Sequence, residues 1–288
     1  MENFHTNFVF FGTPPAARDT LAHLVKNGFV PKVVVTNPDR PQGRGLVLQA
    51  SPTKIWAQEN NIPVFTPEKW DAGAIENVRS YNPAYGVVVA YGKILPPALL
   101  EVFPRGIFNV HYSLLPAYRG AAPVEAAILR GDTMTGVSVQ KVVAALDAGD
   151  VFATRGTEIM PTETARDLRQ RLVVLGADLL TSLLPAILAG DIEGIPQDST
   201  CVTYAPKIKK EDGKISLADD PHINMNKYRA YSEWPGVYFF ARKGDRRIRV
   251  KVTRARFHNG SFIIERVTPE GKREQSYDTF VRAGWIAE

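Results

Sequence analysis

The sequence predicts a doubly wound, mostly parallel α/β sheet followed by a smaller, mostly β domain. Apolar strand-like runs alternate with helical patterns through the first half of the chain, and a polar connector and short strand-like runs follow. A length of 288 residues suits one large domain and one smaller domain. We therefore predict a first domain over 1–190, a linker over 191–207 and a basic C-terminal domain over 208–288.

The first strand and helix are predicted on either side of a turn. Residues 8–11 form an apolar run that ends at the Gly- and Pro-containing turn 12–15, after which Ala17, Leu21 and Leu24 recur at helical spacing. Further elements follow in order: strands at 32–36, 64–65 and 86–91, and helices near 52–60 and 72–80. Near-continuous apolar strands separated by helices indicate a parallel sheet covered on both faces. No Gly-x-Gly-x-x-Gly follows the first strand, which disfavours a nicotinamide cofactor.

The second half of the chain changes character. Residues 164–188 carry leucines at helical spacing and predict one long amphipathic helix closed by Gly190. Residues 191–207 contain glycine and prolines without clear periodicity, as expected for a linker. Beyond them we predict a short helix near 225–231 and strands at 237–240, 248–252 and 262–264.

Composition limits the classes of function. The apolar stretches 87–90 and 179–188 are too short, or too interrupted by Ser182 and Pro185, to span a bilayer, so no membrane segment is expected. The N-terminus lacks the pattern of a secretory signal, so a cytoplasmic location is expected. Cys201 is the only cysteine and has no partner for a disulfide or a metal site.

A cluster of basic residues lies near the C-terminus. The net charge is +5, and eight basic residues against the single acid Asp245 occur over residues 242–256. Such a basic face favours a polyanionic partner, and a solvated strand surface is the alternative reading.

The informative polar residues lie on one predicted strand. Asn109 and His111 share a strand face because side chains alternate with period two. The strand breaks at 113–116, so both side chains lie near its C-terminal end, where open α/β sheets bind ligands. A satisfied core histidine beside a strand-end asparagine is the structural alternative.

A third residue strengthens the functional reading. Asp147 lies in a loop of small residues between the strand-like runs 135–143 and 151–159. A carboxylate can orient a histidine and favour its charged form. The alternative role of Asp147 is turn formation beside Gly149, which Asp150 fits better.

These residues resemble the signature of the folate-dependent formyltransferases, whose catalytic set is Asn, His and Asp in this order. The resemblance rests on Asn109 to Pro123 with the Ser-Leu-Leu-Pro continuation, and on Asp147-Ala-Gly-Asp150. It extends to Phe11-Gly-Thr-Pro14, to 36–45, to Ser51-Pro52 and to 88–96. Thr203-Tyr-Ala-Pro-Lys207 is similar to the entry into the C-terminal barrel of the members that formylate a charged tRNA.

The resemblance implies a fold and a chemistry. The fold is a Rossmann-like formyltransferase domain with an OB-like C-terminal β-barrel. The co-substrate is 10-formyltetrahydrofolate, and no metal is required. Asn109, His111 and Asp147 are the implied catalytic residues, with Asn109 and His111 as donors to the oxyanion of a tetrahedral intermediate. The implied folate-binding positions are Val89, Ala90, Tyr91, Gly92, Ile94, Ser113, Leu114, Leu115 and Pro116.

The resemblance also implies a charged initiator tRNA as the partner of a monomeric enzyme. The loop 39–45 matches a family loop that enters the acceptor end of the tRNA. The implied tRNA-binding residues are Arg40, Arg44, Arg246, Arg247, Arg249 and Lys251. The chain departs from the family where Leu46 and Val47 replace the usual lysines, and its C-terminal domain is shorter by about a hairpin.

Two other functions remain open from the sequence. A relative of the same fold formylates an amino sugar on a nucleotide and shares the catalytic set, but it does not need the Arg44 loop or a basic C-terminal face. A catalytically inactive RNA-binding protein is the alternative from a different class, and the joint presence of Asn109, His111 and Asp147 argues against it. Glycinamide ribonucleotide formyltransferases normally end where the predicted linker begins.

Overall fold

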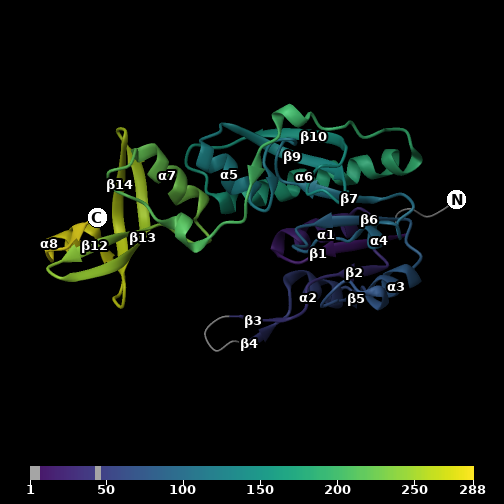
Figure 1. Ribbon diagram of the computed structural model, residues 1–288, viewed down its shortest axis with the longest axis horizontal. Helices are drawn as coiled ribbons and strands as arrows, with labels where there is room; N and C mark the ends of the chain where they lie inside the picture. Colours follow the sequence, from purple (N-terminus) through teal and green to yellow (C-terminus); the bar gives the residue numbers. More distant parts are fainter. Residues whose placement is uncertain (1–6, 43–46) are drawn as a thin grey trace. The chain divides into compact units, whose positions relative to one another are not determined.

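The computed structural model describes residues 7–42 and 47–288 (Figure 1). The described chain divides into two compact units, and neither unit is continuous in sequence. Unit 1 comprises Met1–Gly120, Gly136–Thr157 and Arg169–Tyr204. Unit 2 comprises Ala121–Thr135, Glu158–Leu168 and Ala205–Glu288. The predicted boundaries after residues 190 and 207 stay a prediction.

A seven-stranded sheet forms the centre of unit 1, in the order β10-β9-β7-β6-β1-β2-β5. Neighbouring strands from β5 through β7 pair in parallel, and β7 pairs with β9 in the antiparallel direction. The prediction of a mostly parallel sheet is therefore confirmed. The strands are β1 (Phe8–Gly12), β2 (Val33–Val35), β5 (Val64–Phe65), β6 (Tyr85–Val89), β7 (Ile107–His111), β9 (Met134–Lys141) and β10 (Val151–Glu158).

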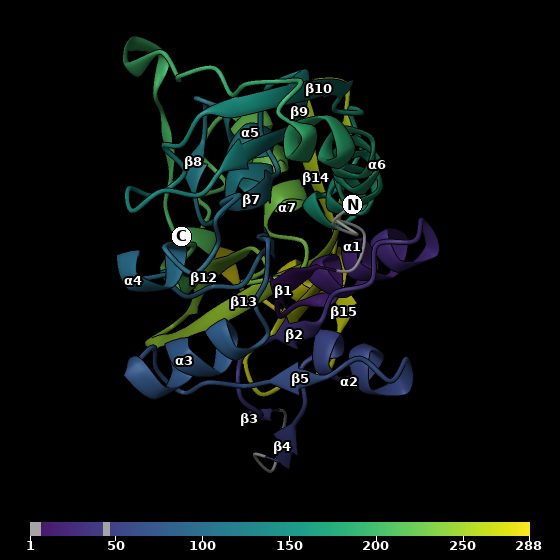
Figure 2. The ribbon, with the colours of Figure 1, turned by 90° about the vertical axis from the view of Figure 1, so that its right-hand side faces the viewer.

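Helices cover both faces of this sheet. In Figure 2, α1, α2 and α6 lie on one side of the sheet, and α3 and α4 lie on the other side. The helices are α1 (Pro15–Lys26), α2 (Pro52–Glu59), α3 (Ala72–Ser80), α4 (Pro97–Leu100) and α6 (Ala165–Ala189). Two helix starts are fixed by side-chain caps: Ser51 accepts from the Lys54 amide at 3.0 Å and Asp71 accepts from the Ala74 amide at 2.9 Å.

The strand order reverses between β1 and β6. From β1 the chain proceeds outward through β2 and β5, then returns to β6 on the opposite side of β1 and continues to β7. In open α/β sheets, ligands bind outside the carboxyl ends of the strands at such a reversal. The segments that follow β1, β6 and β7 are therefore the expected position of a site.

The long helix α6 corrects one expectation. Pro185 lies inside a continuous helix of 25 residues that is long and apolar enough to cross a membrane by length and composition. The reasoning that Ser182 and Pro185 interrupt this stretch was therefore wrong. The helix is nevertheless a core helix, because Leu172, Leu180 and Leu184 have no exposed surface. A Cβ on Gly176 would lie 2.6 Å from Val110 of β7, so the helix backbone approaches the sheet closely.

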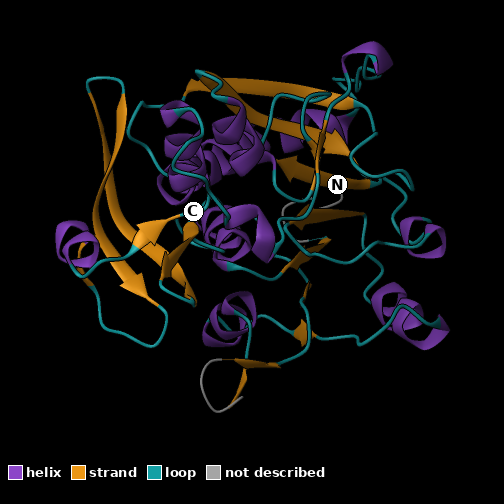
Figure 3. Cartoon of the chain, turned by 60° about the vertical axis from the view of Figure 1, so that its left-hand side comes forward, coloured by secondary structure: helices purple, strands orange, loops and turns teal. Residues whose placement is uncertain are grey.

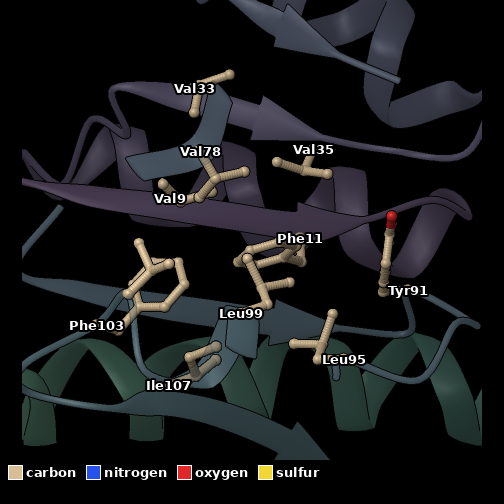
Figure 4. Close-up of a cluster of buried hydrophobic side chains, with 11 residues drawn as sticks. Val9, Phe11, Val33, Val35, Val78, Tyr91, Leu95, Leu99, Phe103 and Ile107 are labelled. Atoms are coloured by element: carbon tan, nitrogen blue, oxygen red, sulfur yellow. The ribbon is translucent and has the colours of Figure 1, made fainter. Parts of the chain in front are cut away.

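A hydrophobic cluster packs between the sheet and the helices on the α3 and α4 side (Figure 4). Phe11 of β1 lies at its centre, with Tyr91, Phe103 and Trp70 at ring-centroid distances of 5.7, 5.9 and 6.1 Å. The buried members are Val9, Phe11, Val33, Val35, Val78, Tyr91, Leu95, Leu99, Val102, Phe103 and Ile107. The cluster extends to Tyr91 and so fixes the segment that follows β6.

Unit 2 is built on a five-stranded sheet in the order β15-β14-β13-β12-β16, with antiparallel neighbours throughout. The long β13 and β14 pair is the clearest feature of this part in Figure 3. The predicted smaller β domain is confirmed as this antiparallel sheet. Its strands are β12 (Tyr238–Lys243), β13 (Arg246–His258), β14 (Ser261–Pro269), β15 (Gln275–Ser276) and β16 (Ile286–Ala287).

Three helices accompany that sheet. They are α5 (Pro123–Arg130), α7 (Pro221–Ala230) and α8 (Tyr277–Arg282). Arg229 of α7 is 7% exposed and donates to the carbonyl of Met160 at 3.1 Å and to the side chain of Asn226 at 2.8 Å. Burial lowers the pKa of Arg229, and Glu163 opposes that shift. The arginine thus ties α7 to the segment that precedes α6.

The remaining elements are short. They are β3 (Arg40–Gln42), β4 (Val47–Gln49), β8 (Arg119–Gly120), β11 (Tyr204–Ala205), η1 (Ser199–Cys201) and η2 (Lys210–Gly213). β3 and β4 pair in the antiparallel direction, and β8 pairs with β11. The predicted linker is held to unit 1 before it reaches η1, because Ile195 forms an isolated bridge with Val151.

Candidate active site

His111 is the last residue of β7 and is 6% exposed. Its Nε2 lies 2.8 Å from the carbonyl oxygen of Tyr118, so Nε2 carries a proton and donates, because a carbonyl oxygen can only accept. Its Nδ1 lies 3.7 Å from Oδ2 of Asp147, which is longer than a hydrogen bond. Both ring nitrogens therefore face oxygen atoms.

Asp147 is brought to His111 by the loop between β9 and β10. Its carboxylate is 12% exposed and accepts two strong hydrogen bonds. The Gly120 amide donates to Oδ2 at 2.9 Å, and Nε2 of Gln140 donates to Oδ1 at 2.9 Å. Donors to both oxygens fix the orientation of the carboxylate.

Asn109 belongs to the same group of residues through the strand register. It lies two residues before His111 on β7, so the two side chains share a face of the sheet. Gln140 lies directly opposite Asn109 on β9, and paired residues on neighbouring strands project from the same face. Because Gln140 donates to Asp147, the register brings Asn109, His111 and Asp147 to one region of unit 1.

The segment after β7 is fastened to β9 by a serine that sequence reasoning missed. The hydroxyl of Ser138 donates to the carbonyl of Ser113 at 2.7 Å and accepts from the amide of Leu115 at 3.0 Å. The hydroxyl of Ser113 donates to the carbonyl of Ala117 at 2.6 Å, and the Leu115–Pro116 peptide bond is cis. The predicted folate positions Ser113 to Pro116 therefore form a fixed turn beside His111.

The predicted folate positions after β6 have different surroundings. Val89 is buried at the end of β6, while Ala90 and Gly92 are exposed and have positive φ angles of 47° and 79°. Ile94 is 81% exposed. The ring of Tyr91 lies in the hydrophobic cluster, and burial raises the pKa of its phenol. Tyr91 can therefore contribute its backbone to a pocket rather than the face of its ring.

Polar side chains from the ends of β1 and β2 bind the segment that follows β6. The side chain of Asn37, just after β2, donates to the carbonyl of Tyr91 at 2.9 Å and to the hydroxyl of Thr13 at 3.1 Å. The hydroxyl of Thr13 lies 3.3 Å from the same Tyr91 carbonyl. The carboxyl ends of β1, β2 and β6 are thus linked to one another at the reversal of strand order.

The predicted tRNA-binding residues fall in two regions. Arg40 is exposed at the start of β3, whereas Arg44 and Leu46 lie outside the described residues. Val47, the second departure from the family pattern, is 63% exposed on β4. The other four predicted residues, Arg246, Arg247, Arg249 and Lys251, lie on β13.

The β13 surface is basic but partly neutralised. Arg242 and Arg247 pair with Glu288 at 2.7 and 2.6 Å, and Arg254 and Arg256 pair with Glu265 at 2.8 and 2.9 Å. The basic face predicted over residues 242–256 thus also carries two carboxylates from outside that range, Glu265 of β14 and Glu288 after β16.

Aromatic rings hold two of these arginines in place. The guanidinium of Arg249 lies 3.7 Å from the centroid of Tyr238, and that of Arg247 lies 4.0 Å from the centroid of Phe240. A register shift in the β13–β14 pairing after Val252 keeps Arg254 on the exposed side. The strand therefore presents arginines along most of its length.

Among residues 7–42 and 47–288, no group of three His, Cys, Asp or Glu side chains is placed to hold a metal ion. Cys201 is exposed and free.

Comparison with known proteins identifies two matched regions. Residues 6–184 match the family model described as formyl transferase, and residues 207–265 match the formyl transferase C-terminal domain. The chain is 42% identical over 233 residues to a methionyl-tRNA formyltransferase of Geobacter metallireducens, covering 81% of this chain and 75% of that protein. It is also 42% identical to the Geobacter sulfurreducens methionyl-tRNA formyltransferase, with coverages of 81% and 74%.

Solved structures share the fold at low sequence identity. A methionyl-tRNA formyltransferase from Clostridium thermocellum has a TM-score of 0.61 at 19% identity, over 92% of this chain and 98% of that one. An N-formyltransferase from Helicobacter canadensis, solved with folinic acid and dTDP-3-aminofucose, has a TM-score of 0.61 at 20% identity, over 90% and 95%. The fold alone therefore does not separate the two acceptor classes.

Proposed function

The chain belongs to the formyltransferase family, and we propose that it transfers a formyl group from 10-formyltetrahydrofolate to the α-amino group of methionyl initiator tRNA. The observation that carries the proposal is the 42% identity over 233 residues to methionyl-tRNA formyltransferases. The sequence therefore favours the tRNA acceptor, whereas the fold is common to both acceptor classes.

The proposed chemistry begins with attack of the amine nitrogen on the formyl carbon. A carbon–nitrogen bond forms, and the formyl oxygen becomes the oxyanion of a tetrahedral intermediate. Asn109 and His111 are the proposed donors to that oxygen, and such preorganised donors contribute about 3 to 4 kcal/mol each. The intermediate collapses by breaking the bond to N10 of the folate, and the proton lost by the attacking amine passes to N10.

Asp147 supports the imidazole in this scheme. Its carboxylate faces Nδ1 of His111 and stabilises the charged ring that donates to the oxyanion. In the structure, Nε2 of His111 donates to the Tyr118 carbonyl. A formyl oxygen that binds His111 therefore has to share or replace this partner, as apo catalytic groups commonly do when substrate arrives.

The folate is proposed to bind along the segments after β6 and β7. The residues present fit a pterin, because Ala90 and Gly92 have left-handed backbones whose peptide groups lie at an exposed edge of unit 1. Ser113 to Pro116 form the fixed turn beside His111. When bound, the folate supplies the formyl group and the leaving nitrogen.

The tRNA is proposed to contact the Arg40 loop and β13. The guanidinium groups of Arg247 and Arg249 lie over the rings of Phe240 and Tyr238, which restricts their side chains and leaves them able to contact phosphates or unstacked bases. Arg246 and Lys251 are exposed on the same strand. The enzyme is proposed to act as a monomer in the cytoplasm, where charged tRNA and reduced folate are available.

An acceptor assay tests the proposal. The purified protein is incubated with 10-formyltetrahydrofolate and, in parallel, methionyl initiator tRNA, uncharged tRNA and a dTDP-linked amino sugar. We expect formylmethionine only in the first reaction, detected by mass spectrometry after hydrolysis of the ester. Formylation of the amino sugar in place of the tRNA would support the sugar enzyme, and no product with either acceptor would support the inactive RNA-binding protein.

A further inference from the structure

We propose that Gln197, in the connector between the two matched regions, is a positioning residue for Asp147. The connector covers residues 185–206, which neither matched region includes. The inference rests on the proposed function, because it assigns Gln197 a part in the same reaction. It means that the connector completes the catalytic loop of unit 1 as well as joining two parts of the chain.

The amide of Gln197 bridges two backbone groups of the catalytic loop. Its Nε2 donates to the carbonyl of Asp147 at 2.9 Å and to the carbonyl of Gly149 at 2.7 Å. A third acceptor, Oε1 of Gln140, lies at 3.5 Å. Gln197 therefore binds the backbone of Asp147 while Gln140 binds its carboxylate at 2.9 Å.

The other end of the same amide is held by an arginine. Nε and Nη2 of Arg119 donate to Oε1 of Gln197 at 3.0 and 2.8 Å. The orientation of the amide is unambiguous, because carbonyl oxygens only accept and a guanidinium only donates. The reverse orientation would place the amide nitrogen against the donors of Arg119 and the amide oxygen against two carbonyls.

These hydrogen bonds form a closed ring that includes the carboxylate of Asp147. Arg119 is followed by Gly120, whose amide donates to Oδ2 of Asp147 at 2.9 Å. Gln197 thus connects the segment that supplies this donor to the loop that carries the acceptor. Release of Gln197 would loosen both sides of the Gly120–Asp147 hydrogen bond.

The loop needs such a restraint because its backbone is strained. Asp147 has a φ of 49°, in the left-handed region, which is uncommon for residues with a side chain even though Asp adopts it more readily than most. Strained backbone persists only where the surroundings fix it. Gly149 packs so closely against β9 that an added Cβ would overlap the carbonyl of Lys141. The two carbonyls that Gln197 holds belong to these two residues.

The neighbouring residue of the connector offers a matched control. Asp198 is exposed, and its carboxylate accepts from the amide of Thr200 at 2.9 Å and from its hydroxyl at 2.7 Å. These contacts cap η1 and stay within the connector. Asp198→Ala therefore changes the same segment without touching the catalytic loop.

The first measurement is steady-state formyl transfer by the full chain. Gln197→Ala is expected to lower kcat by about 30-fold and to change the folate KM by less than about threefold, since misplaced catalytic groups slow the chemical step. In an Asp147→Asn background the same substitution is expected to lower kcat by less than about twofold, because Gln197 acts through Asp147. Asp198→Ala is expected to retain wild-type kcat.

The second measurement is hydrogen exchange at the Gly120 amide, which requires no substrate. We expect exchange to accelerate by about tenfold in Gln197→Ala and to stay at the wild-type rate in Asp198→Ala. If the alanine variant does not fold, Gln197→Met keeps the side-chain volume and removes the polar contacts. Melting curves establish that each variant is folded.

Two results would overturn the inference: equal loss of kcat from Gln197→Ala in both backgrounds, or unchanged exchange of the Gly120 amide in a folded Gln197 variant. Failure of the wild-type protein to formylate methionyl-tRNA would contradict the proposed function instead. The exchange measurement still decides whether Gln197 restrains the loop in that case.

Discussion

Tyr112 follows His111 directly and makes the stability of unit 1 sensitive to alkaline pH. Its side chain is buried, and burial raises the pKa of its phenol to about 12. Below pH 10 the folded and unfolded chains both keep this proton. As the pH rises from 10 towards 12, only the unfolded chain loses it, so the free energy of unfolding falls by about 1.4 kcal/mol per pH unit for each such group.

We expect Tyr112→Phe to reduce this alkaline loss. Urea denaturation between pH 9 and 11.5 measures the free energy of unfolding, and its slope with pH should become shallower in the variant. Tyr204→Phe is the control, because that ring is 68% exposed. Equal slopes in the wild-type protein and Tyr112→Phe would show that the phenol is ionised with equal ease in both states.

At the residue level, the sequence predicted the polar centre of the site but not its supports. Asn109 and His111 follow from strand alternation, and the 3.7 Å contact of His111 with Asp147 agrees with the proposed set. Gln140, Ser138 and Gln197 carry no local signal. Their contacts depend on the register of β7 against β9 and on the path of the connector, which are properties of the folded chain.

The helices and strands show the same difference. Elements with a local sequence signal were predicted, and features that depend on strand pairing were not. Helix α3 was predicted near 72–80 and spans Ala72–Ser80, where Asp71 caps its start. Strand β13 was predicted as five residues, 248–252, but extends over Arg246–His258. The register shift after Val252 breaks the period-two pattern that sequence reasoning uses. Helices α4, α5 and α8 were missed.

Two glycines inside helices allow a test of how α6 packs. We expect Gly176→Ala to lower the free energy of unfolding by about 1 kcal/mol, because the added Cβ would lie 2.6 Å from Val110 and overpacking outweighs the better helix propensity. Gly73→Ala in α3 should raise it by about 0.5 to 1 kcal/mol, because Gly73 is exposed and its Cβ would meet only Asp71 at 3.6 Å. Urea denaturation of both variants checks the signs. Stabilisation by Gly176→Ala would contradict close packing of α6 on the sheet.

For the whole molecule, the fold class followed from the alternation of strand and helix patterns, and the two matched regions agree with it. The antiparallel pairing of β9 with β7 was not foreseen, because the direction of a strand depends on how the chain returns to the sheet. The division into two units that are discontinuous in sequence was also not predicted from the sequence. Ala121–Thr135 and Glu158–Leu168 group with the C-terminal part, and the buried Arg229 that binds Met160 gives no sign of this in the sequence.

In the proposed mechanism an amide, an imidazole and a carboxylate act together on one tetrahedral intermediate. The most direct measurement is the single-turnover rate of formyl transfer to methionyl initiator tRNA at saturating 10-formyltetrahydrofolate. We expect Asn109→Ala and His111→Ala each to lower this rate by about 100- to 1,000-fold, with the folate Kd changed by less than about threefold. A wild-type rate in either variant, or a loss explained by weaker folate binding alone, would contradict the account.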